Sequence, residues 1–183
     1  MLVDRMLRAA RLEPALYNEV EADRNATAEA LTVVVLVALA GGIGTAIGTL
    51  FRGHPAAALG GLIFGIAAAL IGWIIWSYVT YLVGTTMFGG TATPGQMLRC
   101  IGFAQSPRVL DILGFIPCFG GLIRLVVAIW ALVAGIIAVR EALDFSTGQA
   151  ILTAIIGFIA MIIIYAIIAL IVTIFGIGLS ALF

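Results

Sequence analysis

Long stretches of this chain contain no charged residue. None occurs in residues 53–98 or in residues 145–183. Runs of about eighteen or more apolar residues without charges are typical of helices that cross a lipid bilayer. The whole chain is 63% hydrophobic and 10% charged, whereas soluble domains average about 25% charged residues. The sequence therefore predicts an all-α, polytopic integral membrane protein.

Polar turns and glycine-rich loops divide the apolar sequence into five predicted transmembrane helices. The first two are joined by a polar turn that begins at Arg52, and the third follows the loop at Gly89–Gly95. A second turn, at Pro117–Gly121, joins the third helix to the fourth, and Asp144 marks the exit from the fourth. The predicted helices cover residues 29–51, 57–88, 94–116, 122–139 and 147–175, followed by an apolar tail at 176–183.

Local signals at the helix ends support this division. Thr93 and Gln96 have the spacing of a capping box, in which two side chains satisfy the free backbone donors of a helix start. Ser146 and Gln149 repeat the pattern before the fifth helix. Pro107 lies inside the third helix, where its ring removes one backbone hydrogen bond, so we expect a kink there.

Residues 1–28 form a predicted cytoplasmic segment, amphipathic and then acidic, that precedes a membrane domain of residues 29–183. At about 100° per residue, the apolar residues of the first helix fall in one arc and its charged residues in the opposite one. Such a helix can lie in the membrane interface or pack on the protein's own cytoplasmic face, and the pattern leaves both possibilities open. The apolar arc holds Leu2, Val3, Met6, Leu7 and Ala10, and the charged arc holds Asp4, Arg5, Arg8 and Arg11.

The arginine distribution predicts the orientation. Basic residues accumulate in cytoplasmic loops, and with a cytoplasmic N-terminus the inner side holds six of the nine arginines. Five helices then place the C-terminus outside. We expect a multi-pass protein of the cell (inner) membrane, with the lipid bilayer as its first partner.

Three charges near the second turn are predicted to form a polar core. Arg108, Asp111 and Arg124 lie among apolar helices, and charges at that depth usually pair or face the bundle interior. If both flanking segments are α-helical, the heights of Asp111 and Arg124 differ by about 3 Å. We therefore expect Asp111 to accept from Arg124, from Arg108 or from both. Structural pairing is the favoured interpretation, and a proton or ion relay is the alternative.

Two GxxxG patterns flank the first turn. Gly44 and Gly48 lie in the first helix, and Gly61 and Gly65 lie in the second. Small residues allow close approach of two helices in a membrane. The pattern predicts that these helices pack closely through their glycine faces.

No pattern in the chain predicts catalytic, cofactor-binding or metal-binding residues. His54 is the single histidine and lies in a predicted outer turn, and no cluster has metal-ligand spacing. Cys100 and Cys118 are expected to be buried, unpaired thiols because a helical separation of that length exceeds the reach of a disulfide. The formal net charge is zero, which argues against nucleic acid as a partner.

The second half resembles the Yip-domain family, in its compact bacterial form. The resemblance extends over residues 14–165, and its most specific part is Arg140–Gly148. It implies five transmembrane helices, a cytoplasmic N-terminus and no catalytic residues. Eukaryotic members take part in vesicle trafficking and bind small GTPases, whereas a bacterial member would keep the fold and a membrane-organising role. The stretches that carry the resemblance are Arg99–Ala104, Ser106–Pro107, Ile116–Pro117, Ala128–Trp130 and Val139–Ala150.

The resulting functional prediction is a non-enzymatic membrane protein that binds other proteins or organises the bilayer. Its expected partners are other membrane proteins or further copies of itself. The alternatives are a small transporter or channel that uses Arg108, Asp111 and Arg124, or an accessory subunit of a larger membrane complex.

Overall fold

The computed structural model describes residues 1–51, 53, 55–117 and 119–180. Every regular element in that part of the chain is a helix, and none of its residues forms a strand. His54 and Cys118 lie outside the described residues, whereas Cys100 is a buried free thiol. The elements are α1 (Leu2–Ala10), α2 (Pro14–Ala22), α3 (Ala26–Phe51), α4 (Pro55–Phe88), α5 (Pro94–Ala104), the 3₁₀-helix η1 (Ser106–Phe115), α6 (Gly120–Ala142) and α7 (Thr147–Ser180).

Four of the described helices are long and apolar enough to cross a membrane, namely α3, α4, α6 and α7. They correspond to the first, second, fourth and fifth predicted helices. The predicted third helix is instead divided into α5 and η1. A single kinked helix at Pro107 was therefore too simple an expectation, because the chain changes from α to 3₁₀ geometry there and keeps it through Phe115.

Both predicted capping boxes are confirmed. Thr93 N donates to Gln96 Oε1 at 2.6 Å, and Gln96 N donates to Thr93 Oγ1 at 3.4 Å. Ser146 N donates to Gln149 Oε1 at 3.1 Å, and Gln149 N donates to Ser146 Oγ at 3.4 Å. These bonds satisfy backbone donors that a helix start would otherwise leave without partners.

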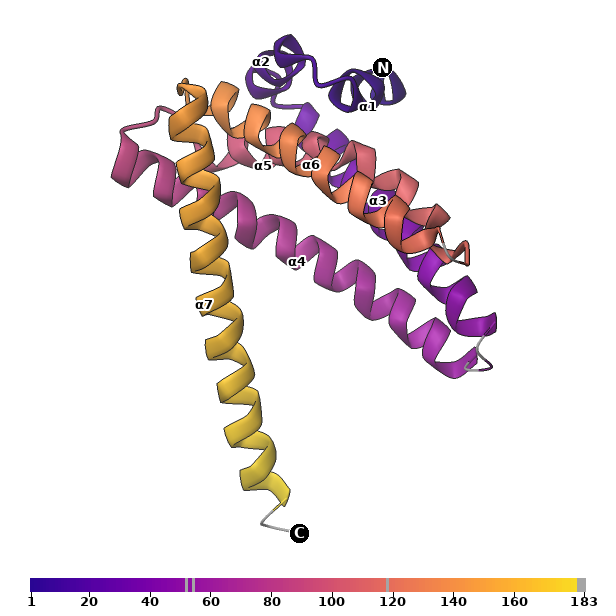
Figure 1. Cartoon of the computed structure of the whole chain (residues 1–183). Coiled ribbons are helices and arrows are strands. Elements are labelled where there is room, and N and C mark those ends of the chain that lie inside the picture. The colour runs from indigo at the N-terminus through magenta and orange to yellow at the C-terminus, as the bar shows by residue number, and fades with distance from the viewer. Residues whose placement is uncertain (52, 54, 118, 181–183) are drawn as a thin grey trace.

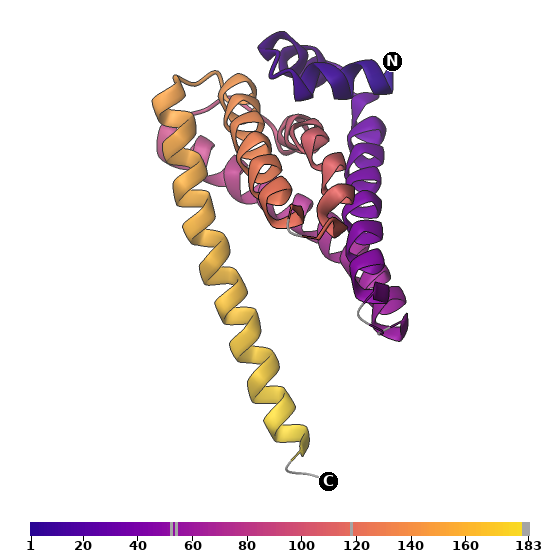
Figure 2. The ribbon, with the colours of Figure 1, turned by 45° about the vertical axis from the view of Figure 1, so that its right-hand side comes forward.

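The helices form two groups (Figure 1). α1 and α2 lie across one end of α3, α5 and α6. α3 and α4 form a long hairpin, while α7 packs on α4 and α6 near its start and then diverges from them. A turned view shows the same separation of α7 toward the C-terminus (Figure 2). We call the α1–α2 pair, residues 2–22, the platform.

The best-buried part of the core lies between the platform and the bundle. It comes from α2, α3 and α5, whose apolar positions recur at helical spacing and face one another. Gly102 permits a close approach here, since a Cβ on it would lie 2.8 Å from Ala30 Cβ. The fully buried side chains include Leu16, Tyr17, Val20, Val33, Val34, Met97, Cys100 and Phe103.

The 3₁₀ geometry lengthens the α5–η1 segment so that it spans nearly the same distance as the stretch of α3 beside it. Gly102 lies against Ala30, and the Ile112 carbonyl lies against Gly44. The interval from Ala30 to Gly44 measures about 21 Å of α-helix. The shorter interval from Gly102 to Ile112 would measure about 15 Å as α-helix, but reaches about 19 Å when the 3₁₀ rise applies from Ser106. Stretching the segment therefore keeps it beside α3.

The predicted glycine contact between the first two membrane helices is wrong. A Cβ placed on Gly48, Gly61 or Gly65 would meet no atom within 4 Å. Gly44 does approach a neighbour closely, but that neighbour is η1: a Cβ on Gly44 would lie 2.7 Å from the Ile112 carbonyl oxygen. The spacing of the glycines gave no information about which element would pack against them.

Gly44 and Gly48 provide a matched pair of substitutions on one helix. We expect Gly44→Leu to destabilise the protein by about 1–3 kcal/mol, because the added side chain collides with the η1 backbone. Gly48→Leu faces open space and should leave the thermal unfolding temperature in detergent nearly unchanged. Equal losses in the two variants would contradict the observed α3–η1 packing.

Candidate functional site

Polar groups gather at two places in this apolar chain, and the first is the junction between the platform and the bundle. Arg99 of α5 is only 7% exposed. Its Nε donates to the Val20 carbonyl at 2.8 Å, its Nη2 donates to the Glu21 carbonyl, and its Nη1 donates to Thr27 Oγ1 at 3.3 Å. Two of its nitrogens therefore bind the C-terminal end of α2, and the third binds the first turn of α3.

The acceptors explain why an arginine is suited to this position. The last carbonyls of a helix have no partner within it and carry partial negative charge, so a cation there is favourable. From the sequence, Arg99 is one of the six arginines predicted to lie inside and the first residue of a stretch that resembles the Yip-domain family. Its role in binding α2 was missed, because backbone carbonyls far away in the sequence leave no pattern in it.

A second arginine holds α1 to the rest of the platform and to α3. Arg5 is 8% exposed, and its guanidinium donates to Glu19 at 2.9 Å, Asp23 at 3.0 Å and Glu29 at 2.9 Å. Burial lowers the pKa of Arg5, but the hydrogen bonds from these carboxylates outweigh it and raise the pKa above its ordinary value. Arg5 therefore stays charged and bridges three elements.

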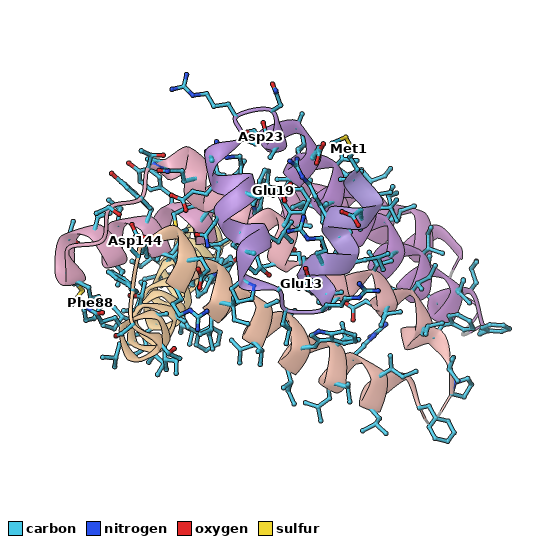
Figure 3. The ribbon with its side chains drawn as sticks, turned by 90° about the horizontal axis from the view of Figure 1, so that it is seen from above. Met1, Glu13, Glu19, Asp23, Phe88 and Asp144 are labelled. Carbon is cyan, nitrogen blue, oxygen red and sulfur yellow. The ribbon has the colours of Figure 1, made fainter. Side chains whose placement is uncertain are left out.

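This arrangement decides which face of α1 packs inward. Arg5 and Ala9 are buried, while Val3 is 67% and Leu7 52% exposed. α1 thus packs on α2 and on the neighbouring end of the bundle. It also leaves part of its apolar arc uncovered. Trp130 of α6 adds a further contact, donating from Nε1 to the Ala10 carbonyl at 2.8 Å. Figure 3 shows the platform from above, with Glu13, Glu19 and Asp23 labelled along it.

Carboxylates from distant segments meet beside α2. Gln96 Nε2 donates to Glu21 Oε1 at 2.7 Å, and Asn18 Nδ2 donates to Glu141 Oε2 at 3.0 Å. Burial raises the pKa of Glu21, as do the nearby charges of Asp144 and Glu141, while Arg99 opposes the shift. These contacts place the end of α6 on the same side of the bundle as the platform.

The second polar place surrounds η1. Pro107 has no backbone donor, and Ser106 Oγ donates to the Phe103 carbonyl at 2.6 Å at the point where α5 ends. A 3₁₀-helix has about three residues per turn, so positions three apart lie one above the other. Arg108 and Asp111 have that spacing, and Arg108 Nε donates to Asp111 Oδ2 at 3.3 Å. Their side chains are 50% and 17% exposed, so the pair lies at the edge of the bundle.

Arg124 does not reach Asp111. Its Nη2 lies 3.5 Å from Thr45 Oγ1, and its guanidinium packs over Gly114. Gly114 follows Asp111 by one 3₁₀ turn, about 6 Å along the axis. The expectation of nearly equal heights assumed α geometry on both sides of the turn, and the larger rise of η1 moves Asp111 about 2–4 Å further away.

An open pocket of about 420 Å³ surrounds the Arg124 side chain. It lies where α3, η1 and α6 meet, near the end of the bundle opposite the platform. We call it the arginine pocket. It is bounded by Thr45, Thr49, Gly114, Pro117, Gly121 and Arg124. Within the described residues, no carboxylate lies within 4.0 Å of Arg124.

Guanidinium groups dominate the chemistry of both places. The described part of the chain contains no group of three or more His, Cys, Asp or Glu residues that could hold a metal ion. At the platform, each buried guanidinium is matched to carbonyls or carboxylates. In the arginine pocket, the Arg124 guanidinium contacts one hydroxyl oxygen among the described residues, that of Thr45.

Comparison with known proteins agrees with the resemblance found in the sequence. A family model described as the Yip1 domain matches residues 14–170. The match begins at the first residue of α2 and extends into α7, so it includes Arg99, η1 and the arginine pocket. No curated protein and no solved structure matches the chain.

Removing the Arg99 guanidinium should loosen the platform. Arg99→Gln leaves buried carbonyls of α2 without donors, at a cost of about 1–3 kcal/mol for each unsatisfied group. We expect faster limited proteolysis between α2 and α3 and a lower unfolding temperature. Arg24→Gln, on an exposed arginine nearby, is the matched control. Unchanged proteolysis in Arg99→Gln would show that apolar packing alone holds the platform.

The raised pKa of Glu21 predicts a pH effect. The folded protein binds this proton more tightly than the unfolded chain, so the contribution of Glu21 to stability falls as pH rises through its folded pKa. Glu21→Gln should therefore raise the unfolding temperature at pH 8 by about 1–3 °C, kept small by solvent screening. The difference should disappear near pH 4, where Glu21 is protonated. An equal gain at pH 4 and pH 8 would contradict this origin of the effect.

Proposed function

The chain belongs to the Yip1 domain family, and from this premise we propose that it is a membrane scaffold that binds other proteins through its platform. Members of this family are non-enzymatic membrane proteins. This chain is accordingly a multi-pass membrane protein without enzymatic activity. Its proposed partners are other membrane proteins or further copies of itself.

The fixed position of the platform is the observation that carries this proposal. Arg99 and Arg5 join α2 and α1 to α5 and α3 through buried, directional hydrogen bonds. A segment that served only as a tail would not need two buried cations to hold it. A surface held rigidly at one end of a helical bundle binds a partner without the cost of ordering a flexible chain.

The same contacts support a fifth membrane crossing made by α5 and η1 together. Asn18 binds Glu141, and Thr91 Oγ1 donates to Asp144 Oδ2 at 2.7 Å, so both ends of the α5–η1–α6 hairpin lie beside the platform. α6 must then begin at the far side, and α5 with η1 carries the chain there. Their combined length is about 36 Å, against about 30 Å of hydrocarbon.

Site-specific photocrosslinking tests the scaffold proposal. A photoreactive side chain at Leu7 or Ala15 on the platform should give discrete protein adducts in native membranes, whereas the same group at Phe158 on α7 should give mainly lipid adducts. An adduct of twice the chain mass would identify self-association, and a set of distinct proteins would identify a larger complex. Lipid adducts alone at Leu7 and Ala15 would contradict a protein-binding platform.

A transport assay addresses the rival function. The reconstituted protein should give no solute or proton flux into liposomes beyond that of empty vesicles. Flux that Asp111→Asn abolishes would instead support the transporter reading of Arg108, Asp111 and Arg124.

Cysteine labelling tests the topology. In a background without Cys100 and Cys118, a cysteine at Phe51 or Ser180 should react with an impermeant reagent from outside intact cells. A cysteine at Asn18 or Thr91 should react only after the membrane is opened. Labelling of Ser180 from inside would exclude the fifth crossing, and labelling of Thr91 from outside would reverse the orientation.

A further inference from the structure

We propose that the arginine pocket binds the phosphate-bearing headgroup of an anionic phospholipid in the leaflet opposite the platform. This site is independent of the platform and of the proteins that the platform binds. The proposal rests on the location of the pocket, on the free donors of Arg124, and on the shape of the walls around it.

The location follows from the helices that form the pocket. Thr49 lies in the last turn of α3, whose described end is Phe51. Gly121 and Arg124 lie in the first two turns of α6. Since α3 and α6 are both membrane-crossing helices, their ends define the boundary between hydrocarbon and headgroups. Arg124 is about 6 Å from the start of α6, within reach of lipid phosphates.

Arg124 has no counter-charge among the residues that the structure describes. A guanidinium has five N–H donors, yet the described contacts of Arg124 amount to one hydroxyl oxygen at 3.5 Å, that of Thr45. Thr45 Oγ1 itself donates to the Gly41 carbonyl at 2.9 Å, which turns its lone pairs toward Arg124. A cation near hydrocarbon requires a partner, and a phosphate matches the planar fork of arginine with two parallel hydrogen bonds.

The walls leave space for that partner. Gly114 has no side chain, so the guanidinium lies flat on the η1 backbone. A Cβ on Gly48 or Gly121 would meet nothing within 4 Å, which keeps the other side of the pocket open. The resulting volume of about 420 Å³ lies within the range of known small-molecule sites. The remaining walls are backbone, apolar side chains and the threonines Thr45 and Thr49, whose hydroxyl groups suit a polar headgroup.

Lipid-dependent stability of the purified full chain provides the test. We expect phosphatidylglycerol in phosphatidylcholine nanodiscs to raise the unfolding temperature relative to phosphatidylcholine alone. Arg124→Gln should weaken the apparent affinity for phosphatidylglycerol at least ten-fold. Gly48→Leu, which keeps the charge but fills the pocket, should also weaken it several-fold. Arg11→Gln removes one exposed platform charge and should retain the full effect.

One further measurement, together with the variants above, decides the outcome. Inorganic phosphate in lipid-free detergent should not reproduce the stabilisation, because a headgroup is held in place by the bilayer and free phosphate is not. A full effect of inorganic phosphate would assign the pocket to a soluble anion and overturn the lipid proposal. An unchanged response to phosphatidylglycerol in Arg124→Gln, or a loss in Arg124→Gln with full retention in Gly48→Leu, would show that the pocket does not bind the headgroup.

Discussion

The guanidinium of Arg99 joins the platform to the helical bundle. It is buried with no carboxylate partner in the described part of the chain, and carbonyls at the end of α2 accept its hydrogen bonds instead. A buried cation is tolerated only when its donors are satisfied, so α2 cannot move away without exposing both the charge and the carbonyls. The buried side chains of Tyr17 and Phe103 belong to the same junction between α2 and α5. The hydrogen bonds of Arg99 define the geometry of this junction.

Much of the architecture could be predicted from the sequence because lipid imposes simple rules. Charge-free runs identified the four long helices, and the capping boxes at Thr93 and Ser146 identified where two helices begin. The resemblance to the family was confirmed by the Yip1 domain match. These features depend on local composition and spacing, which a single sequence contains.

The remaining features depend on which elements meet. The GxxxG patterns predicted that glycines allow close packing of helices, which holds for Gly44, but they predicted the wrong neighbour. Gly44 packs against η1, and Gly48 faces open space. Pro107 signalled a break but not ten residues of 3₁₀-helix, whose length is set by the distance along α3. Of the two partners predicted for Asp111, Arg108 is observed and Arg124 is not, because the rise per residue of η1 could not be known before its packing partner. Arg99 was missed because its acceptors are backbone atoms.

η1 connects these observations. Runs of 3₁₀-helix longer than three or four residues are uncommon, because their hydrogen bonds are poorer than those of an α-helix. Rewinding η1 as an α-helix would improve those bonds but shorten the segment by about 5 Å. η1 contacts α1 of the platform, and its C-terminal end supplies Gly114 beneath Arg124. A shorter segment could not hold both contacts at once. The packing at its two ends therefore stabilises the stretched geometry, and the stretched geometry in turn sets the distance between the platform and the arginine pocket.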